Sequence, residues 1–157
     1  MKTWNAGFLA FGLLFCAVTV FGAGGAPDKP IEPEDPVIEG ARAAIAKNDW
    51  VGAQKGLMDA LARNGQNADY HSLFAYTTRK GPNPDMNLVF KHYNEALRID
   101  PKHRNAHEYI GEAYLMVNNL GKAKEHLAAL DKLCFFSCDE FKDLKKAIAA
   151  YEAKQKH

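Results

Sequence analysis

The most constraining feature of this sequence is an apolar pattern of helical period that recurs about every 34 residues. The pattern begins at Asp35 and shows none of the strict alternation that indicates a half-buried β-strand. Each recurrence is long enough for two helices of about 12 to 15 residues. A helix pair of that size cannot bury its apolar face alone, so successive pairs have to stack. The sequence therefore predicts an all-α fold, an α-solenoid of three helix pairs.

Residues that cap or interrupt helices mark the element boundaries. Asp35 can cap a helix that begins at Pro36, where the missing proline N–H costs no hydrogen bond. Gly65 ends the second helix and Pro101 ends the fourth. The segment 81–84, Gly-Pro-Asn-Pro, interrupts any helix and predicts a turn. These signals divide the chain into copies at 34–67, 68–103 and 104–137.

A further helix is predicted over residues 137–156. Its apolar residues recur at spacings of three, four and three, so they share one face. They are Phe141, Leu144, Ile148 and Tyr151. Ser137 and Glu140 form a capping box at the start of this helix. We expect it to cover the third helix pair as a C-terminal capping helix.

The three copies carry large apolar, small and aromatic residues at matching positions. The third copy has His107, Ile110, Gly111 and Tyr114, then Ala123, Leu127 and Leu130. The second has His71, Phe74, Ala75 and Thr78, then Val89, Tyr93, Ala96 and Pro101. The first has Val37, Gly40, Ala41 and Ala44, then Trp50, Ala53, Leu57 and Ala60.

This pattern resembles the tetratricopeptide repeat (TPR) over residues 34–137. The resemblance implies a TPR domain at 37–156, built of three TPR helix pairs and the capping helix. The small residues at positions 41, 75 and 111 are expected where the two helices of a pair cross closely.

The resemblance also implies a binding site, because TPR proteins usually bind an extended peptide or a partner helix in the groove lined by the first helices of the repeats. Each groove position has an ordinary alternative, a solvated helix face. The positions are Ile38, Arg42, Ile45, Ser72, Tyr76, Arg79, Asn105, Glu108, Glu112 and Leu115.

TPR domains that bind chaperone tails hold a C-terminal carboxylate with Lys, Asn and Arg. The corresponding positions here are Ile38, Arg42, Leu73, Asn105 and Tyr109, so that clamp is mostly missing. This argues against a chaperone tail as the ligand.

The N-terminus has the three-part plan of a secretory signal peptide. Lys2 precedes an uncharged apolar run at 6–21, and small residues follow at 22–26. We predict a signal peptide at 1–25, with an uncleaved membrane anchor or a lipidated Cys16 as alternatives. Residues 26–36 have a proline at every third position, the polyproline II period, which predicts a stiff linker or, alternatively, a ligand for a proline-binding groove.

Removal of the signal peptide leaves two cysteines, Cys134 and Cys138. An even pair in an oxidising compartment suggests a disulfide that staples the capping helix to the third repeat. Two alternatives stay open. A cysteine at a helix N-terminus can be a reactive thiol, and two thiolates can bind a soft metal ion.

Composition and motifs exclude several classes of function. The chain has 20 Lys and Arg against 19 Asp and Glu, which offers no footprint for nucleic acid or an anionic membrane. We find no serine elbow, phosphate-binding glycine loop or metalloprotease motif, so no enzyme and no cofactor are predicted. His103 and His107 have a chelating spacing, but His107 repeats the position of His71, which favours packing over a metal site.

These observations predict an exported, periplasmic TPR adaptor that mediates protein–protein contact during assembly or maturation of an envelope component. Its partner is a protein or peptide, with no nucleic acid and no membrane after signal cleavage. The alternative is a thiol-redox or soft-metal handling protein that uses Cys134 and Cys138.

Overall fold

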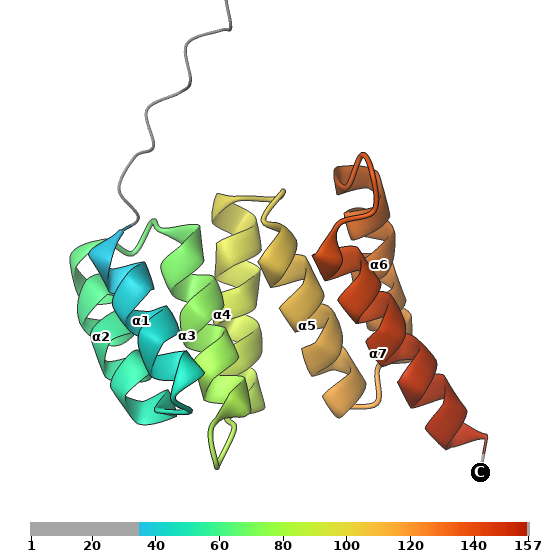
Figure 1. Cartoon of the computed structure of the whole chain (residues 1–157), viewed down its shortest axis with the longest axis horizontal. Coiled ribbons are helices and arrows are strands. Elements are labelled where there is room, and N and C mark those ends of the chain that lie inside the picture. The colour runs from blue at the N-terminus through green and yellow to red at the C-terminus, as the bar shows by residue number, and fades with distance from the viewer. Residues whose placement is uncertain (1–34, 157) are drawn as a thin grey trace, which may run out of the picture. The chain divides into compact units, whose positions relative to one another are not determined.

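The computed structural model describes residues 35–156, which form seven α-helices and, within that range, no strand (Figure 1). The helices are α1 (Pro36–Ala46), α2 (Trp50–Arg63), α3 (Ala68–Lys80), α4 (Met86–Ile99), α5 (Arg104–Met116), α6 (Leu120–Leu133) and α7 (Asp139–Gln155). The all-α prediction is confirmed, and residues 81–84 form the predicted turn. The predicted signal peptide, including Cys16, and the linker up to residue 34 lie outside the described residues. None of the seven helices is both long and apolar enough to span a bilayer.

Local sequence explains where the first six helices begin. In each, the N-cap side chain accepts a hydrogen bond from a backbone N–H of the first turn, which satisfies a group that has no partner within the helix. The N-cap residues are Asp35, Asp49, Asn67, Asp85, His103 and Asn119.

The predicted capping box of α7 is wrong. The N-cap is Cys138, which makes no side-chain capping bond, so α7 begins at Asp139, two residues after Ser137. Glu140 instead places its carboxylate 3.6 Å from the Arg104 guanidinium. The disulfide that holds Cys138 to Cys134 governs how the chain enters this helix.

Two tight turns close the first and third helix pairs. Asn48 and Asn118 both have φ of 58°, in the left-handed region that asparagine tolerates better than most residues. The two turns occupy equivalent places, between α1 and α2 and between α5 and α6.

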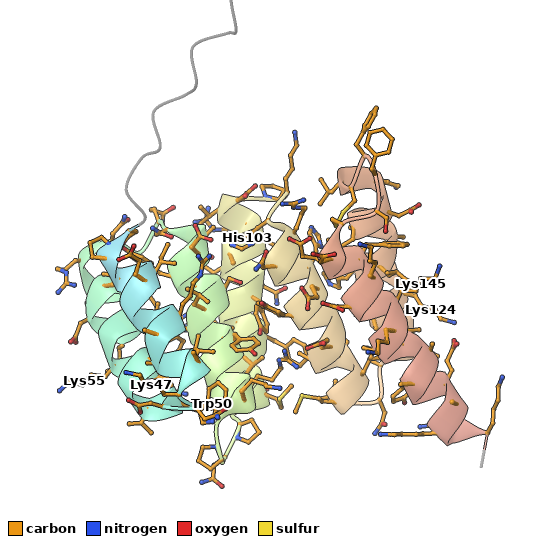
Figure 2. The ribbon with its side chains drawn as sticks, in the orientation of Figure 1. Lys47, Trp50, Lys55, His103, Lys124 and Lys145 are labelled. Atoms are coloured by element: carbon orange, nitrogen blue, oxygen red, sulfur yellow. A yellow bond between two sulfur atoms is a disulfide. The ribbon has the colours of Figure 1, made fainter. Side chains whose placement is uncertain are left out.

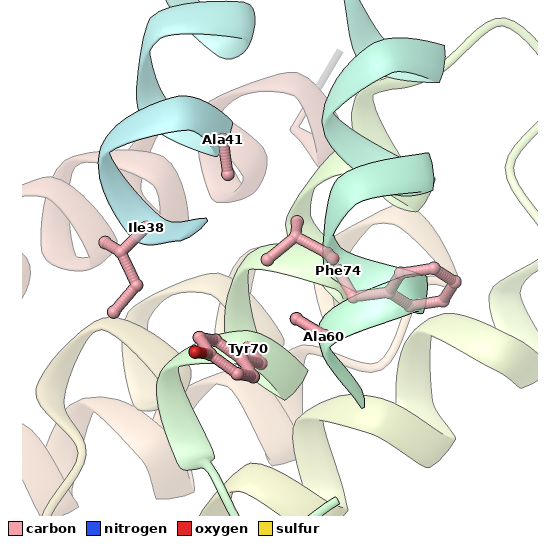
Figure 3. Close-up of a cluster of buried hydrophobic side chains, with 6 residues drawn as sticks. Ile38, Ala41, Ala60, Tyr70 and Phe74 are labelled. Carbon is pink, nitrogen blue, oxygen red and sulfur yellow. The ribbon is translucent and has the colours of Figure 1, made fainter. Parts of the chain in front are cut away.

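The core consists of three apolar clusters distributed along the stack. Figure 3 shows the first, where Ile38 and Ala41 of α1 face Ala60 of α2 and Tyr70 and Phe74 of α3. The second cluster joins α3, α4 and α5 around the fully buried Tyr93, and the third joins α6 to α7 through Leu130, Leu144 and Ile148.

The small residues at 41, 75 and 111 are buried as predicted, but the partner expected for Gly111 is wrong. A Cβ atom on Gly111 would lie 2.6 Å from Leu144 Cδ2, so the close approach is to α7 and not to α6, the other helix of its pair. A Cβ atom at position 111 would therefore force the fully buried Leu144 side chain of the capping helix to shift.

The contacts between helices define an inner side of the stack. Consecutive helices pack together. In addition, α1 contacts α3, α3 contacts α5, and α5 contacts α7. Within residues 35–156, α2, α4 and α6 do not contact one another. The odd-numbered helices therefore lie on the inner side, and α7 packs on both α5 and α6 as a capping helix.

Candidate functional site

A cavity of about 210 Å³ opens on the inner side between α1, α3 and α5, and we call it the inner groove. Five predicted groove residues line it, together with Leu73 and Tyr109, two of the other clamp positions. The full lining is Arg42, Ile45, Ala46, Asp69, Ser72, Leu73, Tyr76, His103, Asn105 and Tyr109. The three helices thus bring their predicted faces to one site.

Two tyrosines form one wall of the inner groove. The ring centroids of Tyr76 and Tyr109 are 4.7 Å apart, and Trp50 meets Tyr76 edge to face at 6.4 Å. Figure 2 labels Trp50, which lies at the start of α2. Burial raises the pKa of both phenols, that of Tyr109 to about 12. At neutral pH the wall is therefore uncharged and carries hydroxyl groups that can donate and accept hydrogen bonds.

Arg79 supports this wall from within. Its guanidinium carbon lies 5.6 Å from the centroid of Tyr76 and 6.0 Å from that of Tyr109. Its Nη2 donates to Glu112 Oε2 at 2.7 Å, and the Arg79 side chain is only 5% exposed. The prediction of Arg79 as a groove-facing residue is therefore wrong, because its buried guanidinium pairs with the partly exposed Glu112 and packs against the two rings.

Polar residues from α3 and from the start of α5 also line the inner groove: Asp69, Ser72 and His103. His103, labelled in Figure 2, caps α5 by accepting from Ala106 N–H through Nδ1 at 3.2 Å. This leaves Nε2 as its N–H. That Nε2 lies 3.2 Å from Asp69 Oδ1, and the interaction lowers the pKa of Asp69, so Asp69 is charged at neutral pH. Ser72 Oγ is buried without a hydrogen-bond partner among the described residues, a cost that a bound polar group would relieve.

Other predicted groove residues lie elsewhere. Ile38 is buried in the first core cluster, and Leu115 packs against the third, because both sit where α1 and α5 meet their neighbours. Glu108 and Glu112 do not line the cavity, and Glu108 is buried, only 9% exposed. Burial, followed by the charges of Glu112 and of two α7 carboxylates, raises the pKa of Glu108 to about 8.

No family model and no curated protein matches the chain, but several solved structures are similar to it. The type III secretion translocator chaperone SycD of Yersinia enterocolitica superposes with a TM-score of 0.66 at 12% identity, over 77% of this chain and 84% of that one. The TPR2B domain of yeast Sti1, in its complex with pHsp70, gives 0.65 at 20% identity over 77% and 95%. The TPR domain of Arabidopsis OM64 gives 0.64 at 20% identity over 73% and 93%.

This chain has the tetratricopeptide-repeat fold. In TPR terms, the inner groove is lined by α1, α3 and α5, the first helices of the three pairs. The predicted TPR solenoid with its capping helix is confirmed.

The second and third TPR pairs each contain a partly buried histidine pair, of which the repeat pattern identified only one member. His71 Nδ1 lies 2.8 Å from His92 Nδ1, and His107 Nδ1 lies 2.9 Å from His126 Nδ1. The Nε2–H groups of His71 and His107 donate to the carbonyls of residues 65 and 101, each at 3.1 Å. Nδ1 of His71 and of His107 then accepts a hydrogen bond from the Nδ1–H group of the histidine on the second helix of the pair.

These pairs explain why histidine recurs in the first helices. Burial and the neighbouring histidine lower the pKa of His92 and of His126 to about 4. His103 and His107 have different partners and do not converge, and residues 35–156 hold no group of three or more His, Cys, Asp or Glu suited to a metal ion. His71, His92, His107 and His126 are hydrogen-bonded packing groups, as the repeat position of His107 predicts.

A disulfide joins Cys134, the C-cap of α6, to Cys138, the N-cap of α7, with Cα atoms 5.5 Å apart. Between them, Phe135 and Phe136 are 93% and 86% exposed. In this state neither thiol is free, and the bond ties the capping helix to the third TPR pair.

Proposed function

We propose that this chain is an adaptor that binds an extended segment of a partner protein in the inner groove. The observation that carries the proposal is the tyrosine wall of Tyr76 and Tyr109, which the partly buried Arg79–Glu112 pair supports beside an open cavity. Side chains locked by their own supports bind without a large loss of conformational entropy.

The size of the cavity favours a peptide over a metabolite. Its volume of about 210 Å³ is below the roughly 300 to 1,000 Å³ of small-molecule sites. It suits one apolar side chain of an extended segment, packed against Ile45, Leu73 and the tyrosines. Asn105 can bond the peptide backbone at the same place, because its side-chain amide both donates and accepts hydrogen bonds.

The neighbours of known fold support a protein partner. SycD is a translocator chaperone, and Sti1 TPR2B was solved in complex with pHsp70. A chaperone tail fits this chain poorly, because two clamp positions are occupied by Leu73 and Tyr109 and a third, Ile38, is buried in the core. We therefore propose an internal segment with an apolar anchor as the ligand.

We further propose that the chain is exported and acts in assembly or maturation of an envelope component. Lys2 with the apolar run that follows it supports export, and the Cys134–Cys138 disulfide fits an oxidising compartment. With the two sulfur atoms bonded to each other, neither is a thiolate that could bind a soft metal ion. Replacement of both cysteines separates the adaptor from a thiol-redox protein.

Selection from a library of random peptides of about 12 residues, followed by fluorescence polarisation, tests the proposal. We expect the selected peptides to share an apolar anchor and to lose about tenfold or more in affinity for Tyr76→Ala, a loss typical of a truncated aromatic anchor. The matched control is Asn94→Ala, at an exposed position of α4. Thermal melting of each variant separates lost binding from lost folding.

A charge-changing variant completes the design. Arg42 is exposed at the edge of the inner groove, and its charge acts on Asp69, so Arg42→Glu is expected to change the charge of the selected peptides, while thermal melting reports any effect on the fold. Failure to enrich any peptide, or equal binding by folded Tyr76→Ala and the parent chain, would contradict a peptide-binding groove.

A further inference from the structure

The exposed side of α2, the second helix of the first TPR pair, is less polar than that of α4, the second helix of the next pair. Val51 and Met58 are 71% and 57% exposed, and they lie two turns apart on the same stripe of the helix. Of the eight exposed positions of α2, five are apolar or small: Val51, Gly52, Gly56, Met58 and Ala62. The exposed positions of α4 are all polar: Asn87, Lys91, Asn94 and Arg98. We call the exposed side of α2 the outer face.

A groove of about 400 Å³ borders the outer face on the side of α1. Its lining includes Gly40 of α1 together with Gly52, Gly56, Asp59 and Arg63 of α2. A Cβ atom on Gly40 or on Gly56 would meet no atom within 4 Å. The groove therefore has room for side chains of another molecule.

Four charged side chains lie along the outer face, and their signs alternate. From the N-terminal to the C-terminal end they are Asp49, Lys55, Asp59 and Arg63. Asp49 belongs to this face because its carboxylate accepts from Gly52 N–H at 2.9 Å. Within residues 35–156 none of the four forms an ion pair. On α4 and α6, by contrast, exposed charges are paired at 2.7 Å, in Arg98–Glu95 and Lys122–Glu125.

The order of the signs selects one occupant for the outer face. A second copy of α2 that runs in the opposite direction presents the reversed order of charges. Lys55 then faces Asp59 of the second copy, and Arg63 faces Asp49 of the second copy. A parallel copy would instead set like charges level with each other.

The apolar residues fit the same antiparallel register. Val51 comes opposite Ala62 of the second copy, and Met58 comes opposite Lys55 of the second copy, whose methylene stem can cover it. These two pairs and the two pairs of charges share a midpoint at residues 56–57. The outer face is therefore complementary to itself, which is the property that a two-fold interface requires.

We propose that the chain forms a two-fold dimer in which α2 packs antiparallel against α2 of a second copy. Figure 2 shows Lys55 pointing away from the stack of helices, where a second copy can reach it. One helix face with part of a groove is small beside the roughly 1,200 to 2,000 Å² of a stable interface, so the dimer is weak.

The dimer leaves peptide binding possible in both copies. No residue of α2 lines the inner groove, which is built from α1, α3 and α5. Each dimer thus carries two inner grooves, and a partner with two suitable segments gains affinity from the high effective concentration of the second groove. The dimer itself does not depend on the proposed function.

Sedimentation velocity of the purified chain between about 1 and 500 µM measures the dimer. We expect a dissociation constant of about 10 to 100 µM. Lys55→Asp and Asp59→Lys should each weaken the dimer by about tenfold or more, because like charges then face each other. The matched control is Lys91→Asp on the exposed side of α4, which should leave the dimer unchanged. Thermal melting shows whether each variant is folded.

Two complementary experiments separate this contact from non-specific association. A chain that carries both exchanges, Lys55→Asp and Asp59→Lys, again sets opposite charges across the two-fold axis and should recover the dimer. An equimolar mixture of the two single variants should form a heterodimer although neither variant associates with itself, because lysine again faces aspartate at both places.

A chain that stays monomeric up to about 500 µM would overturn the proposal. A dimer that both single exchanges leave intact would overturn it as well, and so would a folded double variant that stays monomeric. Each of these outcomes leaves peptide binding in the inner groove untouched, so the dimer and the proposed function fail separately.

Discussion

Replacement of Glu108 by glutamine should stabilise the protein at high pH. The change keeps the shape of the side chain and removes its charge. Burial is the main cause of the raised pKa, followed by repulsion from Glu112, Asp143 and Glu140, while Arg79 opposes them. In the folded chain the pKa is about 8, against 4.5 for an unperturbed group. The folded state therefore binds this proton more tightly than the unfolded state does.

The sign and size of the effect follow from this difference. Below about pH 4.5 both states are protonated and the carboxyl group costs nothing. The cost grows as the pH rises toward 8 and is complete above it. Each unit of pKa difference corresponds to about 1.4 kcal/mol, which gives an upper bound of about 5 kcal/mol and about 2 to 3 kcal/mol once local relaxation is allowed.

Urea unfolding followed by circular dichroism between about pH 4 and pH 9 measures this effect. We expect Glu108→Gln to match the parent chain near pH 4 and to exceed its free energy of unfolding by about 2 to 3 kcal/mol at pH 9. Glu125→Gln on the exposed face of α6 should show no such divergence. A constant difference between Glu108→Gln and the parent chain at every pH would refute the reasoning, since it would mean that Glu108 titrates normally.

Three further predictions concern the stability of the fold. His92→Asn should make the protein less sensitive to acid. In the folded chain His92 has a pKa of about 4, so the parent chain loses stability as the pH falls from about 6.5 toward 4. Urea unfolding should show that the variant loses about 1 kcal/mol less of its free energy of unfolding over this range. Gly56→Ala, with open space around it, should stabilise by about 0.5 to 1 kcal/mol, whereas Gly111→Ala should gain nothing or lose stability against Leu144, as measured in the same assay. Serine at both Cys134 and Cys138 should cost about 2 kcal/mol and leave peptide affinity unchanged; loss of binding with folding intact would instead favour a thiol function.

The sequence predicted the architecture because its signals are local and repeated. Asp35, Gly65 and Pro101 mark helix ends through backbone chemistry that does not depend on tertiary context. The start of α7 could not be predicted in this way. The covalent link from Cys134 makes Cys138 the N-cap, and this overrides the capping preference of Ser137 and Glu140.

The repeat pattern predicts which side of a helix each groove residue lies on, but not how deeply its side chain is buried. The repeat places Tyr76 and Asn105 on the inner side, and both line the cavity. The same rule could not show that Arg79 is buried by its ion pair, because that pair joins α3 to α5. Asp69 and His103 were missed because one lies in the first turn of α3 and the other caps α5, outside the usual groove positions.

The histidine pairs were missed for a related reason. His92 and His126 lie on second helices, 21 and 19 residues beyond their partners. The difference of two residues reflects the longer turn at 81–84. A search for pairs at one fixed spacing would therefore have found one of them and not the other.

Photo-crosslinking inside the cell that makes this protein tests the central claim most directly. Tyr76 on the inner side and Asn94 on α4 are each replaced by p-benzoylphenylalanine, and the adducts are mapped by mass spectrometry. The account predicts an adduct at position 76 that maps to one segment of a partner, with an apolar anchor near the attachment point, and that a peptide from the library selection displaces. Adducts that form equally at both positions, or at position 94 alone, would contradict binding in the inner groove.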